Sequence, residues 1–127
     1  MDVHHVGLAT RDAGGLAEMY GDLVGATVAH RETLDDLELV YLAVGDAYLE
    51  LLEPTGDGDV AAFLERRGGG VHHLAFATDD VRAALDRARA AGVEVIDEDP
   101  RPGGWGHQVA FLHPASTGGV LVEFVEG

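Results

Sequence analysis

The strongest constraint on the fold of this chain is an internal repeat. Residues 4–12 read HHVGLATRD, and residues 72–80 read HHLAFATDD, so that the second histidine of each copy, His5 and His73, is separated by 68 positions. The two copies end alike, with LELLE at residues 49–53 and VEFVE at residues 122–126. Self-similarity on this scale predicts two structurally equivalent modules.

Each copy predicts a strand followed by a helix. Residues alternate in a strand-like way after each histidine pair, and apolar residues then recur at helical spacing. Asp12 and either Asp79 or Asp80 suit the helix starts, while Gly25 and Gly92 suit left-handed C-terminal positions. Three further strands are expected in each half, at residues 27–30, 38–44 and 47–52, then at 93–96, 108–112 and 119–125.

The two modules are expected to form one domain. The chain has 127 residues, the size of one ordinary domain, so a single domain over residues 1–127 is the expectation. Module one covers about residues 1–53 and module two about 71–127. Between them, residues 54–70 predict a linker that packs through a short amphipathic helix at 60–66, with Phe63 and Leu64 turned inward.

Four residues at equivalent places in the repeat are candidate metal ligands. Strand periodicity places His5 and His73 on faces otherwise lined by small residues, which leaves room for a site. Glu50 and Glu123 each interrupt an apolar strand, where a carboxylate is costly unless it is paired or bound to a metal. Two imidazoles and two carboxylates suit a six-coordinate divalent cation with open positions. The alternative is that the histidines are ordinary core residues.

Composition excludes several other functions. There is no cysteine, so thiolate metal sites are impossible, and the formal net charge of −15 argues against nucleic acid as a partner. No apolar run approaches the ~18 residues that span a bilayer, and no basic leader precedes an apolar stretch. We expect a soluble, unprocessed cytoplasmic protein without a membrane partner. Its acidity indicates a saline cytoplasm, the alternative being an ordinary acidic protein.

Over its whole length the chain resembles the vicinal oxygen chelate (glyoxalase-like) metalloenzymes, and more narrowly the methylmalonyl-CoA epimerase family. The family-like segments are HVGLA at residues 5–9, ELLEP at 50–54, FLHP at 111–114 and GVLVE at 119–123. This resemblance implies an α+β fold in which two βαβββ modules form a cup-shaped mixed sheet around a metal. It also implies a homodimer.

The resemblance further implies the chemistry. One divalent ion, commonly cobalt with Mn²⁺, Ni²⁺ or Zn²⁺ as alternatives, is held by His5, Glu50, His73 and Glu123. Some relatives have glutamine at position 50. The enzyme interconverts (2R)- and (2S)-methylmalonyl-CoA by removing the C2 proton through a metal-stabilised enolate. Glu123 and Glu38 are the expected acid–base groups, although Glu38 also reads as a solvated acid at a strand end.

Some alternatives stay open at this point. Many relatives carry lysine where this chain has Ala115, and because the chain has no lysine, the acyl-CoA phosphates would need Arg31, Arg66, Arg67 or Arg101. A lactoylglutathione lyase or a dioxygenase shares the cup, and a non-catalytic binding module of the same fold is the third alternative. His4 and His72 fall on the opposite strand faces and are expected to serve in packing or to support the ligands.

Overall fold

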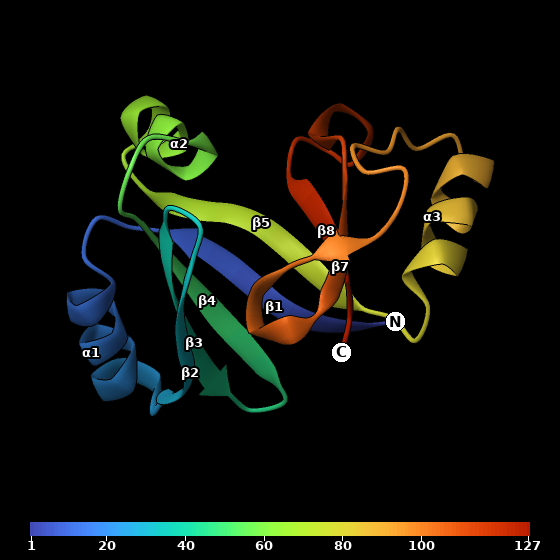
Figure 1. Cartoon of the computed structure of the whole chain (residues 1–127). Coiled ribbons are helices and arrows are strands. Elements are labelled where there is room, and N and C mark those ends of the chain that lie inside the picture. Colours follow the sequence, from blue (N-terminus) through green and yellow to red (C-terminus); the bar gives the residue numbers. More distant parts are fainter. The chain divides into compact units, whose positions relative to one another are not determined.

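The computed structural model describes residues 1–127 and confirms the predicted order of elements in both halves (Figure 1). A strand, a helix and three further strands occur twice, with one helix between the two sets. The elements are β1 (Asp2–Ala9), α1 (Ala13–Val24), β2 (Thr27–Leu34), β3 (Leu37–Val44), β4 (Ala47–Pro54), α2 (Asp59–Arg67), β5 (Gly70–Ala77), α3 (Val81–Ala90), β6 (Arg101–Pro102), β7 (Gln108–Leu112) and β8 (Leu121–Glu126), with single 3-10 turns at Gly104–Gly106 and Pro114–Ser116.

The chain divides into two compact units, one for each copy of the repeat. His5–His72 forms the N-terminal unit, and Met1–His4 with His73–Gly127 forms the C-terminal unit. None of the helices has the length and apolarity needed to span a bilayer. Whether residues 1–127 behave as one domain stays a prediction.

The N-terminal unit is a four-stranded sheet covered by α1 on one face. Its strand order is β2-β3-β4-β1, with β1 parallel to β4 and β3 antiparallel to both of its neighbours. Alternate residues of the strands, among them Val40, Leu42 and Leu51, face α1 and form an apolar core with its Ala13. The opposite face of the same strands carries the other set of alternating side chains, which includes Tyr41 and Glu50.

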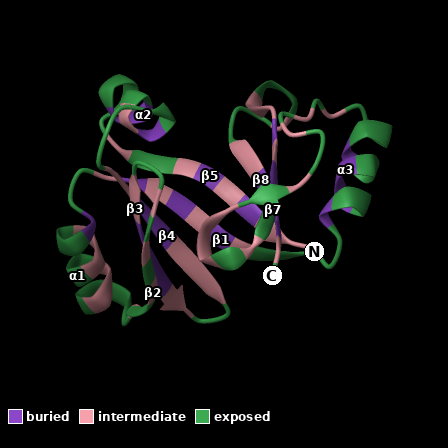
Figure 2. Cartoon of the chain, in the orientation of Figure 1, coloured by how far each residue is buried: buried purple, intermediate pink, exposed green.

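The C-terminal unit repeats this plan with α3. Its strand order is β5-β8-β7-β6, with β5 parallel to β8. The core between α3 and the sheet contains Val81, Ala84, Leu85, Ala88, Ala110, Leu112 and Phe124. Figure 2 shows the matching alternation of buried and less buried residues along β1 and β5.

The helix ends follow the sequence signals. The side chains of Asp12 and Asp80 accept hydrogen bonds from the backbone N–H groups three residues later, so Asp80 and not Asp79 begins α3. Gly25 and Gly92 both adopt left-handed backbone angles, with φ of 73° and 78°, which glycine reaches without steric cost.

A second acid also holds the start of each helix. The Glu53 carboxylate at the end of β4 accepts a hydrogen bond of 2.7 Å from the N–H of Ala13, and that of Glu126 accepts one of 2.8 Å from the N–H of Val81. A carboxylate satisfies an otherwise unpaired donor at a helix N-terminus and interacts favourably with the helix dipole. The final acid of each repeated segment is therefore structural.

The strand expected at residues 93–96 is wrong. Only Val95 makes an isolated bridge, to Leu112, and the N–H of Phe111 on β7 donates to the carboxylate of Asp97 rather than to a backbone carbonyl. Because this side chain replaces a ladder bond, regular pairing stops. At the start of β7, the same edge pairs with β6.

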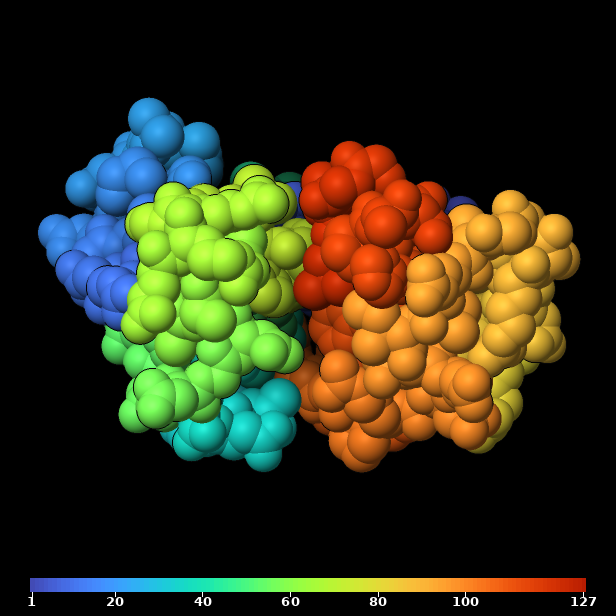
Figure 3. All heavy atoms as spheres, turned by 90° about the horizontal axis from the view of Figure 1, so that it is seen from above, coloured from blue at the N-terminus to red at the C-terminus, as the bar shows by residue number.

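The short helix predicted between the two modules is present as α2. α2 extends one residue beyond the expected 60–66 at each end, and Phe63 and Leu64 are buried. It packs against β4 and belongs to the N-terminal unit. The space-filling view shows the outer side of this segment, in light green, at the surface (Figure 3).

Candidate metal centre

In the N-terminal unit, His5 and Glu50 form a buried pair on the face of the sheet away from α1. Glu50 of β4 lies opposite Gly7 of β1, and His5 precedes Gly7 by two residues, so both side chains point to the same face. The two residues are 2% and 6% exposed, and His5 Nε2 lies 3.5 Å from Glu50 Oε1. Gly7, which is paired with Glu50, adds no side chain to this face.

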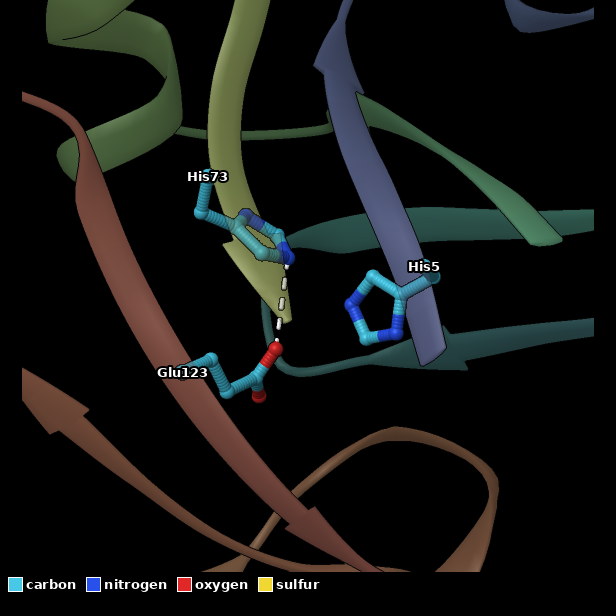
Figure 4. Close-up of side chains that lie close together, drawn as sticks. All are labelled: His5, His73 and Glu123. Atoms are coloured by element: carbon cyan, nitrogen blue, oxygen red, sulfur yellow. Dashed lines mark ion pairs between the residues drawn. The ribbon is translucent and has the colours of Figure 1, made fainter. Parts of the chain in front are cut away.

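The C-terminal unit contains the equivalent pair. Glu123 of β8 lies opposite Ala75 of β5, two residues after His73. His73 and Glu123 are 3% and 6% exposed, and His73 Nε2 lies 3.3 Å from Glu123 Oε1. Figure 4 shows the two side chains projecting toward each other from their strands, with the interaction dashed.

An aromatic ring on the strand next to that of the glutamate, β3 in one unit and β7 in the other, contacts each histidine. Tyr41 lies opposite Glu50 and meets the His5 ring edge-on, with centroids 5.9 Å apart and planes at 88°. Phe111 lies opposite Glu123 and meets His73 in the same way, at 6.0 Å and 85°. Edge-to-face contacts of this kind favour one orientation of the histidine ring. The repeat therefore preserves a three-residue arrangement of histidine, aromatic residue and glutamate.

The chemistry of these pairs fits a divalent cation. Each pair directs an imidazole Nε2 and a carboxylate oxygen toward one another in a place almost closed to solvent. Imidazole and carboxylate are ligands that Zn²⁺, Co²⁺, Ni²⁺ and Mn²⁺ accept, and cation binding offsets the cost of burying a carboxylate. The structure thus brings His5 to Glu50 and His73 to Glu123, and all four predicted ligands are buried.

Glu38, the expected second acid–base residue, lies on the other face of the N-terminal sheet. It is paired in register with Glu53 and with Thr33, whose hydroxyl donates a 2.8 Å hydrogen bond to it. Glu53 holds the start of α1, so this is the helix-covered face. The structure does not bring Glu38 to the face of Glu50, because neighbouring strand residues alternate between faces.

Sequence reasoning missed His30 and Glu32 of β2. His30 lies opposite Tyr41 and Glu32 opposite Leu39, so both point to the face of Glu50. Their side chains interact at 3.2 Å between His30 Nε2 and Glu32 Oε1. The spacing H-x-E was visible in the sequence. The face to which the two side chains point depends on the register shift between β2 and β3, which no sequence pattern revealed.

The predicted packing role of His4 and His72 is confirmed. His4 meets His107 edge-on with ring centroids 5.2 Å apart, and His72 meets Phe63 at 5.0 Å. Each histidine that precedes a candidate ligand thus contacts an aromatic ring within its own unit.

Comparisons with known proteins place these features in a family. Residues 4–111 match the model of the glyoxalase/bleomycin resistance protein/dioxygenase superfamily. The chain is 35% identical to the ethylmalonyl-CoA/methylmalonyl-CoA epimerase of Cereibacter sphaeroides over 126 residues, covering 95% of this chain and 94% of that protein.

Solved structures agree. A methylmalonyl-CoA epimerase in complex with methylmalonyl-CoA and NH4+ superposes with a TM-score of 0.93 at 37% identity, covering 99% of this chain and 94% of that one. The epimerase from Mycobacterium tuberculosis gives a TM-score of 0.92 at 35% identity, covering 98% and 87%. The α+β, glyoxalase-like fold is therefore confirmed, and the chain belongs to the methylmalonyl-CoA epimerase family of the glyoxalase/bleomycin resistance protein/dioxygenase superfamily.

Proposed function

We propose that this chain is an isomerase that interconverts (2R)- and (2S)-methylmalonyl-CoA. The observation that carries the proposal is the pair of buried histidine–glutamate contacts at equivalent places of the two units. Several relatives that are 32–35% identical over nearly the whole chain are methylmalonyl-CoA epimerases. The pairing occurs in both units, and its imidazole and carboxylate groups can bind the cation that stabilises an enolate.

We infer that His5, Glu50, His73 and Glu123 together hold one divalent cation, with Co²⁺ favoured and Mn²⁺, Ni²⁺ or Zn²⁺ as alternatives. Two neutral imidazoles and two carboxylates balance the charge of such an ion, and the burial of all four residues keeps competing water away. When bound, the cation supplies Lewis acidity that draws electron density toward the substrate oxygens.

Glu123 is proposed to carry a proton as well as to bind the cation. Its carboxylate removes the proton from C2 of one epimer, and the electrons of the C–H bond pass into the thioester carbonyl as an enolate forms. A proton then returns to C2 from the opposite side, which inverts the centre. A positioned acid–base group of this kind contributes typically 10²–10⁴-fold to the rate.

Of the candidate arginines, Arg101 is the one that we propose to meet an anionic part of the substrate. It pairs with Val109, which pairs with Val125, so it lies on the same face of the C-terminal sheet as Glu123. Its guanidinium lies 5.1 Å from the centre of the Phe111 ring and its Nε 3.0 Å from Asp97. Arg31 lies opposite Val40, a residue of the α1-facing core, so it points away from Glu50.

The remaining expectations concern the state of the protein in the cell. We propose a cytoplasmic homodimer, and the exposed apolar side chains Leu23 and Val24 of α1 support self-association. The net charge of −15 supports a saline environment. Because acyl-CoA is itself anionic, activity should rise as salt screens the repulsion.

Proton NMR of methylmalonyl-CoA in D2O tests the proposal. The protein is stripped by chelator, reloaded with Co²⁺ and measured at high salt, with the stripped protein as control. We expect metal-dependent exchange of the C2 proton together with interconversion of the epimers. Folded, metal-loaded protein that shows no exchange would contradict the proposal and direct the search to other substrates of the superfamily, such as the hemithioacetal of glutathione.

A further inference from the structure

We propose that Glu32, positioned by His30, is the second proton carrier of the reaction, in place of Glu38. This inference rests on the proposed epimerase function, and the two residues that it newly assigns, His30 and Glu32, lie within the N-terminal unit. It follows from strand register, from the groups that share the face and from the enclosure of the His30–Glu32 pair.

A bulge in β2 directs both residues toward the face of His5 and Glu50. Thr27 and Val28 pair in one register with β3, and from His30 onward the register is shifted by one residue. Without the shift, Ala29 and Arg31 would point to this face, because side chains alternate strictly along a strand. Bulges frequently re-aim side chains beside active sites, and this one exchanges an arginine for a glutamate.

On this face of the N-terminal sheet, few residues other than Glu32 could act as the second proton carrier. The titratable side chains on this face of the N-terminal sheet are His5, His30, Glu32, Tyr41, Tyr48 and Glu50. Glu50 is assigned to the cation, so Glu32 is the one further carboxylate. Its row across the sheet continues through Leu39, Leu52 and Ala9, all buried and apolar. An apolar floor of this kind suits the methyl-bearing carbon of the substrate.

The pair is more enclosed than an ordinary surface ion pair of this chain. The side chains of His30 and Glu32 are 28% and 24% exposed, against 69% and 73% for Arg82 and Asp99. The His30 ring also rests against Tyr41, with centroids 5.9 Å apart, and Tyr41 contacts His5. His30 is thus held by the same ring that orients a proposed ligand, and it can fix one oxygen of Glu32.

The proposed step balances. Glu32 takes the C2 proton of one epimer, a second, protonated carboxyl group delivers a proton to the opposite side of C2, and the roles reverse for the other epimer. One C–H bond breaks and one forms, and the two carboxyl groups recover their starting protonation by exchange with solvent. No oxidant, reductant or further reactant is needed.

The test uses each epimer separately in D2O with the Co²⁺-loaded Glu32→Gln variant. We expect epimerisation to fall by roughly 10²–10⁴-fold, while the epimer served by Glu123 still exchanges its C2 proton without inverting. Loss of exchange for one epimer alone is the signature of a missing second base. Glu65→Gln, an exposed acid on α2, is the matched control for removing one negative charge.

Several results would overturn the assignment. These are epimerisation within about threefold of the parent, equal loss of exchange for both epimers at unchanged metal content, or a larger loss in Glu38→Gln than in Glu32→Gln. If the parent protein itself exchanges no proton, the proposed function fails, which is a separate outcome. Should Glu32→Gln not fold, Glu32→Asp serves instead, with a partial loss confined to the same epimer.

The role of His30 has its own readout. Glutamine places an amide near the position of His30 Nε2, so His30→Gln should retain most of kcat while His30→Leu lowers kcat with little change in KM. Equal kcat in both variants would overturn the positioning role.

Discussion

The two units share a histidine, an aromatic residue and a glutamate, yet they differ at their outer strands. The ring contacts of His5 with Tyr41 and of His73 with Phe111 have nearly equal centroid distances and interplanar angles. By contrast, β2 is a full strand of eight residues that presents His30 and Glu32, whereas β6 has two residues and presents Arg101.

This difference separates two kinds of function. The repeated inner strands supply the proposed ligands in equal number from each unit. The outer strands, which are not repeated in detail, supply a proposed proton carrier in one unit and a proposed anion-binding arginine in the other. Specific chemistry is thus placed on the edges of a common scaffold, as expected where function resides in sites rather than in the fold.

The largest expected difference is between Glu123 and Glu50. Glu123→Gln should lower kcat by about 10³-fold, because it removes a proton carrier. Glu50→Gln should cost only about tenfold, because an amide oxygen can still bind a divalent cation. Steady-state assays at saturating Co²⁺ measure both. Equal losses of kcat in the two variants would contradict the proposal that Glu123 carries a proton and Glu50 only binds the cation.

A smaller effect is expected at Arg101. Arg101→Gln should raise KM for the acyl-CoA roughly three- to tenfold with little change in kcat, because a charge-assisted contact to substrate is lost at a half-exposed site. Arg31→Gln is the matched control, since Arg31 points to the opposite face of its sheet. A rise in KM in the control as large as in Arg101→Gln would indicate a general charge effect.

The smallest effect is expected where the units are most alike. Glu53→Gln and Glu126→Gln each weaken the hydrogen bond to a helix N-terminus, to Ala13 and Val81. Each should lower the free energy of unfolding by about 1 kcal/mol, which corresponds to a fall in Tm of about 3–5 °C. Thermal denaturation followed by circular dichroism measures this. Metal affinity should not change in either variant.

Much of this arrangement could be predicted from the sequence, because it depends on local alternation and on the repeat. The constant offset identified the equivalent histidines, and the acids at Glu50 and Glu123 stood out within apolar strands. The caps at Asp12 and Gly25 follow from backbone chemistry that acts over a few residues.

What could not be predicted depends on pairing between strands. Glu38 and Glu32 are both acids in neighbouring strands, and only the register of β2 and β3, including its bulge, decides which one faces Glu50. The strand expected at residues 93–96 failed for a related reason, since the Asp97 side chain takes the place of a backbone partner. Neither event leaves a periodic signal in the sequence.

The central claim is that both units contribute to one cation, and its most direct test is the metal stoichiometry of the stripped protein titrated with Co²⁺ by calorimetry and checked by elemental analysis. We predict one ion per chain, lost in His5→Ala and equally in His73→Ala, with Leu23→Ala as an unaffected control. Two ions per chain, or one ion retained at full affinity when either histidine is removed, would contradict the account.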